Sequence, residues 1–483
     1  MRSGGSIRDR LKRLGVEEGG GGEPKRVVRK VQRKEAPIGR PNIEKRKEDV
    51  VREGIRQRPG PDSRQLSKPD SRQDSHRRPR PPRQDSPEDS QPAPSPRLRP
   101  PRPRSLAPKG PPDGAYPTPT SASSIVQAEI TKYKAYFPTL EEVVTLTYPT
   151  GKEESFLLLT PRSANEYVPL EEVLATVRVV VDHLVPDQHR HLFRTGGEGP
   201  PLTPSIVRRL ERAKNIKDGD LFSRALVDYN AALGELARSG QLSAHVDGMT
   251  ELPLSLSRLV QLQVHNRVVG PAADQLNKYT PWTDNVYGEL TTKFMDKLFR
   301  HLAQSEVDPL DGDDRLFLDL GCGTGNCVVQ AVLQKGCRAV GVEMMPVPAG
   351  LGQRQAVELE ARTRGFFGLE IPHPEIIQGD FLRDKRVECA NLVSSADVIL
   401  INNYAFSPET NEGIKTLLYE AKEGSWVVSL KPLFQPRTVG TIDAAFRVEP
   451  RDYHSGDVSW TDQGGMYYLA RRRASGKGVD RRV

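Results

Sequence analysis

Three regions of the chain differ in how hydrophobic and polar positions alternate. Up to residue 122 apolar residues are sparse and follow no period. Between residues 123 and 283 they recur three or four positions apart, which predicts amphipathic helices. The predicted helices span residues 169–185, 202–215 (with Thr203 as N-cap), 221–238 and 253–269. Because residues 143–159 alternate around Pro149–Gly151 as in a β-hairpin, we expect a mostly helical lobe that carries one hairpin.

From residue 284 the pattern changes to short apolar runs separated by helical segments. Such runs are typical of strands buried on both faces. The predicted strands span residues 315–320, 338–343, 375–380, 398–402 and 424–432, and two more lie within 446–460 and 465–472. Because strands alternate with helices, we predict an α/β fold with a Rossmann-like, seven-stranded, mostly parallel sheet.

Composition separates the first region from the rest. Residues 1–120 hold 30 Lys and Arg against 16 Asp and Glu, whereas the remainder holds 41 against 47. We therefore interpret residues 1–122, which are also rich in proline, as a disordered basic tail that attracts polyanions. Within it, KRVVRKVQRK (25–34) is either a solvated charge run or a nuclear import signal or DNA contact, and the sequence leaves these alternatives open.

The four cysteines form neither a metal-binding pattern nor a disulfide framework. They include no C-x-x-C pair, and no histidine follows at zinc spacing, so we expect no metal. No apolar run reaches the roughly 20 residues that a membrane span needs, and the N-terminus lacks an apolar signal core. We expect a soluble intracellular protein in a reducing compartment, with no membrane partner.

A glycine turn follows the first predicted strand of the sheet. In DLGCGTGN (319–326), three glycines allow the backbone to approach a ligand at the start of a helix. Three predicted strands end in carboxylates, at Asp319, Glu343 and Asp380. Open α/β sheets bind ligands at the carboxyl ends of their strands. The glycines alone are compatible with a plain turn, but the ordered carboxylates favour a ligand site.

The spacing of these residues favours one ligand. A dinucleotide site prefers G-x-G-x-x-G with amides turned to a pyrophosphate, whereas this chain has the shorter G-x-G-x-G. Glu343 is placed to hydrogen-bond both hydroxyls of a ribose. Asp380 followed by Phe381 suits an adenine amine and its ring. An amino-acid-bearing nucleoside fits this set, so we predict S-adenosyl-L-methionine as cofactor and a class I methyltransferase fold.

Two adjacent carboxamides, Asn402 and Asn403, end the predicted strand at 398–402. Methyl transfer to an amine needs a neutral amine, and desolvation lowers the pKa of a lysine amine. A carboxylate beside the amine would favour the ammonium, whereas a carboxamide supplies polar contacts without charge. Our hypothesis is that the Asn402 carboxamide either orients the methionine end of the cofactor or accepts from the amine, and so leaves the pKa of the amine low. Asn403 points the opposite way along the strand and braces either the YGEL loop (287–290) or the turn that follows the asparagines. The alternative is that both are structural turn formers.

Seven motifs in register resemble one family closely. They are TPWTDNVYGEL (280–290), FLDLGCGTGN (317–326), GVEMMPVPA (341–349), GDFL (379–382), VILINNYAF (398–406), KEGSWVVSLKP (422–432) and VSWTDQGGMYYL (458–469). Their order is similar to that in the non-SET histone methyltransferases called disruptor of telomeric silencing, which methylate lysine-79 of histone H3. The helical lobe before these motifs matches loosely.

The resemblance implies a role for each matching position. Asn402, Tyr287 and Tyr467 are implied in catalysis, with Asn402 at the mouth of a lysine channel that Tyr467 helps to line. The residues implied in cofactor binding are Tyr287, Gly288, Glu289, Leu290, Phe317, Leu318, Asp319, Leu320, Gly321, Cys322, Gly323, Thr324, Gly325, Asn326, Glu343, Asp380 and Phe381. Asn326 stands where the animal pattern has the longer Gln, which leaves its direct contact with the cofactor open.

The resemblance also implies partners, a location and an organisation. It implies a monomeric nuclear enzyme that acts on histone H3 in nucleosomes, has the histone H4 tail and ubiquitylated H2B as further partners, and holds nucleosomal DNA with its basic tail. It implies roles in chromatin organisation, telomeric silencing and the DNA damage response. The predicted parts are a disordered tail (1–122), a helical N-terminal lobe of the catalytic domain (123–283), a methyltransferase domain (284–473) and a basic C-terminal tail (474–483).

Two other functions are compatible with parts of the sequence. A methyltransferase for RNA or for another protein is disfavoured because NNYAF is neither the NPPY nor the DPPY usual for methylation of base amines. A catalytically inactive chromatin-binding protein is disfavoured because Asp319, Glu343 and Asn402 are all present.

Overall fold

The computed structural model describes residues 117–138, 143–163, 166–194, 205–276, 288–434 and 442–474. All of them belong to one compact unit, Pro94–Val483. The predicted tails lie outside the described residues, except for residues 117–122 and 474, and so does Tyr287.

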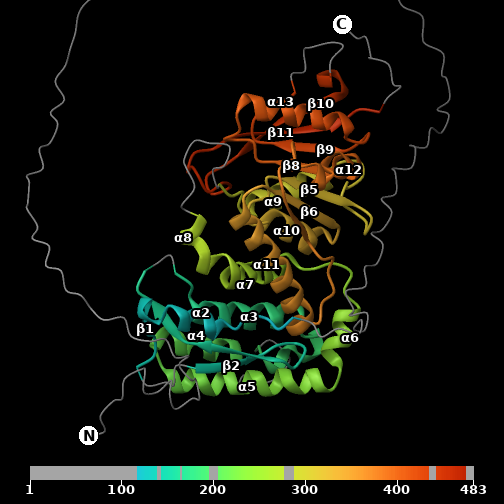
Figure 1. The fold of residues 1–483 in the computed structure, drawn as a ribbon. Coiled ribbons are helices and arrows are strands. Elements are labelled where there is room, and N and C mark those ends of the chain that lie inside the picture. The colour runs from blue at the N-terminus through green and yellow to red at the C-terminus, as the bar shows by residue number, and fades with distance from the viewer. Residues whose placement is uncertain are drawn as a thin grey trace, which may run out of the picture. The chain divides into compact units, whose positions relative to one another are not determined.

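A seven-stranded sheet forms the centre of the C-terminal half (Figure 1), in the order β10-β11-β9-β8-β5-β6-β7. The parallel strands are β5 (Leu316–Leu320), β6 (Arg338–Glu343), β7 (Glu375–Gln378), β8 (Val398–Ile401) and β9 (Trp426–Ser429). Two antiparallel strands, β11 (Gly465–Arg472) and β10 (Phe446–Tyr453), complete it. The predicted Rossmann-like, mostly parallel sheet is confirmed. The chain reverses its direction of winding between β5 and β8, and such switch points are ligand sites.

Helices cover both faces of this sheet. They are α9 (Thr292–Ala303), α10 (Asn326–Lys335), α11 (Pro346–Arg362), α12 (Cys389–Ser395) and α13 (Pro408–Leu417). Successive side chains of a strand point to opposite faces. Leu316, Leu318 and Leu320 of β5 therefore join a core with α12 and α13, whereas Phe317 joins a second core with α9 and α10. This two-sided burial explains why the strands read as continuous apolar runs.

The helical lobe precedes the sheet, as predicted. Its elements are α2 (Ala122–Ala128), η1 (Ile130–Lys132), β1 (Tyr133–Ala135), β2 (Val143–Thr147), β3 (Glu153–Leu157), β4 (Leu159–Pro161), α3 (Pro169–His183), α4 (Ile206–Ile216), α5 (Gly219–Arg238), α6 (Gln241–Asp247), α7 (Leu254–Val268) and α8 (Ala273–Leu276). The hairpin prediction is confirmed by β2 and β3. The N-cap prediction for α4 is wrong, because the Ser205 hydroxyl caps the helix by accepting from the Arg208 amide at 3.2 Å. Among the described residues no helix has the length and apolarity needed to cross a membrane.

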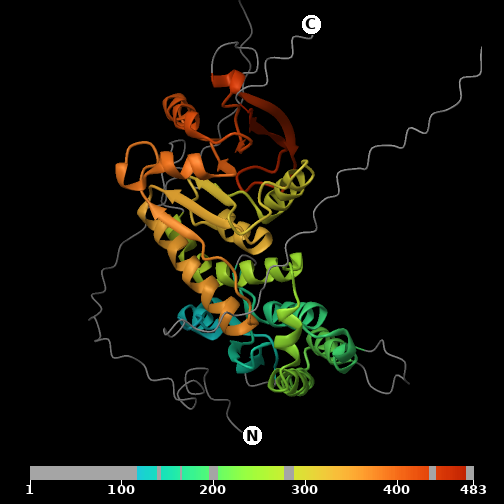
Figure 2. The same cartoon turned by 90° about the vertical axis from the view of Figure 1, so that its right-hand side faces the viewer.

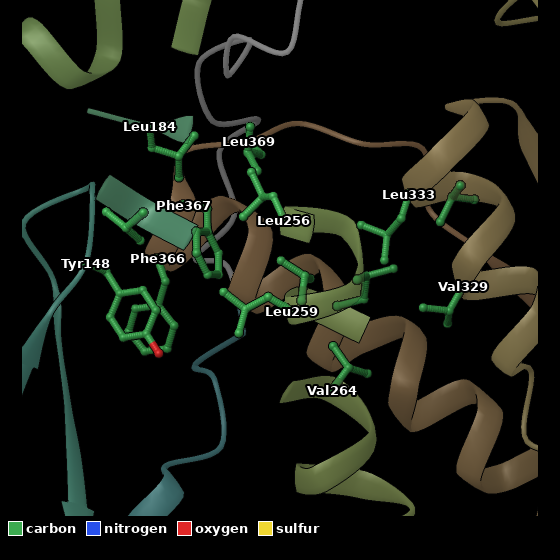
Figure 3. Close-up of a cluster of buried hydrophobic side chains, with 14 of the residues drawn as sticks. Tyr148, Leu184, Leu256, Leu259, Val264, Val329, Leu333, Phe366, Phe367 and Leu369 are labelled. Carbon is green, nitrogen blue, oxygen red and sulfur yellow. The ribbon is translucent and has the colours of Figure 1, made fainter. Parts of the chain in front are cut away.

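The lobe and the sheet share one hydrophobic core, part of which Figure 3 shows. In Figure 2 the elements of the lobe (blue to green) lie beside the region of the sheet (yellow to red). In Figure 3 Leu256 and Leu259 of α7 lie between Tyr148 of the hairpin turn and Leu333 of α10. The ring of Phe366, in the π-helical turn Thr363–Phe367 that extends α11, stacks on Tyr148 with centroids 4.3 Å apart.

Buried ion pairs reinforce this junction. Arg362 of α11 and Arg267 of α7 pair with Glu154 of β3 at 2.7 and 3.1 Å, and all three side chains are at most 1% exposed. Arg267 also pairs with Glu172 of α3. Burial raises the pKa of Glu154, but the two guanidinium groups lower it further and leave it below its ordinary value. Because breaking one partner of such a pair leaves a buried charge, these contacts fix α11 against the lobe.

Candidate active site

The glycine turn between β5 and α10 is built around left-handed backbone. Gly321, Gly323 and Gly325 have φ values of +83°, +56° and +80°, a region that side chains other than glycine rarely adopt. A Cβ on Gly325 would also lie 2.8 Å from Ile376 Cδ1. The Gly321 amide donates to the Val342 carbonyl at 2.8 Å, so the turn is fastened to the end of β6.

Glu343, the last residue of β6, is bound by the backbone on two sides. Its Oε2 accepts from the Gly323 amide at 2.9 Å, and its Oε1 accepts from the Met345 amide at 2.7 Å. Burial raises its pKa, although these two bonds oppose the shift. A carboxylate has about four lone-pair sites, so Glu343 retains acceptor capacity for a ligand.

Asp319 lies beside Glu343, one residue before the end of β5. It is 3% exposed, and burial together with the Glu343 carboxyl raises its pKa to about 8. A raised pKa of this kind in a cavity wall marks a candidate functional group. A cationic ligand would stabilise the ionised forms of both carboxyls.

Asp380 does not end a strand, because β7 stops at Gln378. Its Oδ1 accepts from the Leu382 and Arg383 amides at 2.8 and 3.2 Å, which makes it a turn former. It nevertheless lines the same cavity as Phe381. The structural and the ligand-binding interpretations of this residue are therefore compatible.

These groups surround one cavity of about 280 Å³ at the carboxyl edge of the sheet. The predicted site residues that line it are Gly288, Glu289, Leu290, Asp319, Gly321, Cys322, Gly323, Thr324, Asn326, Glu343, Asp380, Phe381 and Asn402. They come from five separate stretches of sequence. The fold therefore brings together most of the residues that the sequence analysis singled out.

The remaining predicted residues do not line the cavity. Phe317, Leu318 and Leu320 are fully buried in the two cores, and Gly325 turns toward Ile376. Tyr467 is 1% exposed. Its hydroxyl lies 2.6 Å from His301 Nδ1, and its ring packs edge-on against Phe294. Alternate residues of β11 face opposite sides of the sheet, and Tyr467 is on the side that α9 covers. Tyr287 lies outside the described residues.

Several lining residues were not predicted. They are Cys327, Met344, Met345, Pro348, Leu382, Arg383, Phe406 and Thr410. Six of them lie within five residues of the ends of β6, β7 or β8. Their position after a strand end is the signal that could have found them, since ligands bind where parallel strands end.

The two asparagines after β8 make different contacts. Asn402 Nδ2 donates to the Gly288 carbonyl at 3.0 Å, whereas its Oδ1 is buried without a hydrogen-bond partner among the described residues. Asn403 Oδ1 accepts from the Leu430 and Lys431 amides, both at 2.9 Å. Asn403 therefore braces the turn after β9, a contact that the sequence analysis did not predict. Asn402 is the residue that faces the cavity.

Residues 288–290, called the 288–290 segment below, form one wall of the cavity. Glu289 donates its amide to Ser459 Oγ at 2.8 Å and accepts from the Ser459 amide at 2.9 Å. Leu290 forms a β-bridge with Val458. These contacts fix the segment to the connection between β10 and β11.

Comparison with known proteins shows which family this chain resembles. Residues 265–472 match the family model described as histone methylation protein DOT1. The "Histone-lysine N-methyltransferase, H3 lysine-79 specific" of Mycosarcoma maydis is 41% identical over 276 residues. The proteins of the same name from Aspergillus fumigatus and Emericella nidulans are each 32% identical, over 339 and 353 residues. The matches cover 55%, 69% and 71% of this chain, and 33%, 64% and 67% of those relatives.

This chain thus spans between one third and two thirds of the length of these relatives. A solved RNA methyltransferase from Salinibacter ruber, in complex with S-adenosyl-L-homocysteine, is 17% identical with a TM-score of 0.26 over 40% of this chain and 99% of that one, a likeness too low to carry an argument. The family model and the curated relatives decide the matter: the chain belongs to the DOT1 family of histone methylation proteins.

Proposed function

We propose that this chain transfers methyl groups from S-adenosylmethionine to lysine-79 of histone H3 in nucleosomes. Three relatives carry names that state this specificity. The environment of the Asn402 side chain is the observation that supports the proposal most directly. Its carbonyl oxygen is buried without a hydrogen-bond partner among the described residues, in a side chain that lines the cavity. A buried unpaired acceptor costs free energy, and an incoming amine would satisfy it.

The residues of the cavity fit S-adenosylmethionine as cofactor. We propose that Glu343 accepts from the ribose hydroxyls and that the glycine turn, up to Asn326, lies along the methionine end. Asp380 and Phe381 are assigned to the adenine, where the Phe381 and Phe406 rings, with centroids 6.4 Å apart, offer an apolar wall. When bound, this cofactor would supply an electrophilic methyl group on a cationic sulfur.

The catalytic task of the protein is then to hold a neutral amine in line with that methyl group. Positioning of two reactants contributes roughly 7–11 kcal/mol in well-oriented cases. Asn402 carries no charge, so it accepts a hydrogen bond from the amine without raising the pKa of the amine as a carboxylate would. We retain as part of the proposal the two roles that the family resemblance implies: Tyr287 takes part in catalysis, and Tyr467 helps to line the lysine channel.

The proposed substrate places the protein in the nucleus, on nucleosomes. We assign the basic segment 1–122 to nucleosomal DNA, because cationic residues bind the phosphate backbone without reading sequence. The histone H4 tail and ubiquitylated H2B are proposed as further partners on the basis of the family alone. A monomeric state is proposed on the same ground.

One labelling experiment tests the function. The protein is incubated with radiolabelled S-adenosylmethionine and, in separate reactions, with nucleosomes, free histones and total RNA. We expect label on histone H3 in nucleosomes, and peptide mapping should locate it at lysine-79. Nucleosomes whose H3 has arginine in place of lysine-79 should take up no label. Label on RNA, or no transfer by a protein that binds the cofactor, would overturn the proposal.

A further inference from the structure

A relay of three side chains connects α11 to the 288–290 segment. Gln355 of α11 donates its amide to the Thr324 carbonyl at 2.6 Å and to Asn326 Oδ1 at 3.0 Å. Asn326 donates its own amide to Glu289 Oε1 at 2.7 Å. Asn326 and Glu289 line the cavity, whereas Gln355 lies behind it and is 0% exposed.

Acceptors at both ends fix the direction of this relay. The carbonyl of Thr324 only accepts, so Gln355 must present its NH₂ group there. The same NH₂ group meets Asn326, which must therefore present its oxygen. Asn326 then has only its NH₂ group left for Glu289, and an ionised carboxylate also only accepts. Each carboxamide has one orientation that satisfies both of its neighbours.

The burial of Gln355 costs free energy of folding, so we look for a role of this side chain other than stabilising the fold. Its Oε1 is buried without a hydrogen-bond partner among the described residues. An unsatisfied buried acceptor costs free energy, whereas an apolar side chain of similar shape at this site would avoid that cost. The Nε2 of Gln355 reaches only the Thr324 carbonyl and Asn326 in the described residues, so its contribution lies in orienting these two.

We propose that Gln355 is a positioning residue for the cofactor site: by orienting the Asn326 carboxamide, it holds Glu289 and the 288–290 segment over the cavity. This inference rests on the proposed function, because the benefit is a closed wall around S-adenosylmethionine. It also gives Asn326 a task that requires no direct contact with the cofactor. The 288–290 segment is then held by three sets of contacts: those with Ser459 and Val458, the hydrogen bond from Asn402 to the Gly288 carbonyl, and the hydrogen bond from Asn326 to Glu289.

A reversal of the relay tests the proposal. In Gln355→Glu, burial favours the protonated acid, which donates to Thr324 and offers its carbonyl to Asn326. Asn326 then rotates its amide and turns its oxygen toward the Glu289 carboxylate. We expect the affinity for S-adenosylmethionine, measured by calorimetry, to fall about tenfold to a hundredfold, because a hydrogen bond to a charged group is lost.

The double variant separates positioning from a general loss of structure. In Glu289→Gln the new amide accepts or donates, so it pairs with Asn326 in either orientation. In the Glu289→Gln background, Gln355→Glu should therefore lower the affinity for S-adenosylmethionine by less than about threefold. A double-mutant cycle would then show strong coupling between the two positions. An equal loss in both backgrounds, with circular dichroism spectra unchanged, would show that Gln355 acts through packing alone and would overturn the proposal.

Asn326→Asp provides the same test if Gln355→Glu does not fold. It brings two carboxylates together at positions 289 and 326. Glu289→Gln should rescue this variant, because the carboxylate introduced at position 326 then meets only donors. No rescue in that background also overturns the proposal. Failure of the proposed function is distinguishable, because it appears in the labelling experiment with the wild-type protein, whereas the relay is tested by the affinity of the variants for S-adenosylmethionine.

Discussion

The side-chain amide of Asn402 donates a hydrogen bond of 3.0 Å to the backbone carbonyl of Gly288. The bond joins the end of β8 to the 288–290 segment, which is 114 residues away in the chain. It also fixes the orientation of the carboxamide, because a carbonyl only accepts. The Oδ1 atom of Asn402 is left for a ligand, and the first two predictions follow from this division of roles.

Replacing Asn402 by alanine should lower turnover much more than cofactor affinity. The reacting amine loses its acceptor and its alignment, and misplacement by about 1 Å costs on the order of a hundredfold in rate. Affinity for S-adenosylmethionine should change only a few-fold. Single-turnover kinetics on nucleosomes and calorimetric binding measure the two effects separately. Parallel losses of rate and affinity would place Asn402 at the cofactor instead of the methyl.

Replacing Asn402 by aspartate should shift the pH dependence of the rate. A nearby carboxylate stabilises the ammonium form of the acceptor lysine and raises its pKa by about 1–3 units. The rate of Asn402→Asp should therefore reach its maximum at higher pH than the wild-type rate. Asn402→Ala is the matched control and should keep the wild-type profile at reduced rate. Superimposable profiles for aspartate and wild type would contradict the proximity of residue 402 to the amine.

Asp319 should make the protein less stable as the pH rises. Its pKa is about 8 when folded and about 3.9 in an unfolded chain, so between these values the folded state holds a proton that the unfolded state has released. The free energy of unfolding then falls with rising pH, by about 1.4 kcal/mol per unit in this window. Asp319→Asn has no proton to lose and should show a shallower decline. Urea unfolding at pH 5 and pH 7.5 measures both slopes, and identical slopes would refute the assignment.

Replacing Gly288 and replacing Gly350 by alanine should have opposite effects on stability. A Cβ on Gly288 would lie 3.0 Å from Trp460 Cε3, whereas a Cβ on Gly350 of α11 would meet nothing within 4 Å. Gly288→Ala should displace the 288–290 segment at a cost of about 1–3 kcal/mol and weaken cofactor binding. Gly350→Ala should stabilise the helix by about 0.5–1 kcal/mol with affinity unchanged. Thermal unfolding and calorimetry test the pair, and weaker binding by the Gly350 variant would undermine the comparison.

A truncation that tests the basic tail should end before residue 117. Thr120 donates its amide and its hydroxyl to Glu358 Oε2 at 3.0 and 2.8 Å, and the Ala122 amide donates to Glu154 at 2.9 Å. Removing residues 1–116 should weaken nucleosome binding and flatten its salt dependence, with cofactor affinity unchanged. Removing residues 1–122 should also lower the free energy of unfolding by about 1–3 kcal/mol, because two buried carboxylates lose donors. Unaltered nucleosome binding by the first truncation would exclude the tail as an anchor.

Much of the sheet could be predicted because its strands are buried on both faces. Val398–Ile401 is apolar at every position, and few other structures produce such a short run between helical segments. The carboxyl ends of these strands then gather Asp319, Glu343 and Asn402 at one edge, whatever the details of packing. The family resemblance supplied the 288–290 segment, which periodicity alone does not reveal.

Residue contacts across the sheet could not be read from the pattern. Alternation along β11 says that Tyr467 and Tyr468 face opposite sides, but only the position of α9 places Tyr467 against His301 and Phe294. The N-cap of α4 was missed for a related reason. Thr203 and Ser205 are both good caps, and where the helix begins depends on its packing against α5, which the local sequence does not contain.

The order of strands and helices, the glycine turn and the polar groups at the strand ends follow from the sequence, because they depend on local periodicity and on backbone conformations that residues other than glycine rarely adopt. Three features depend on the folded chain instead: the pairing of Asn402 with Gly288, the relay from Gln355 to Glu289 and the burial of Tyr467. These contacts join segments far apart in the chain. Their geometry is set by how the helices pack on the sheet, and hydrogen-bond partners at such distances leave no local mark in the sequence.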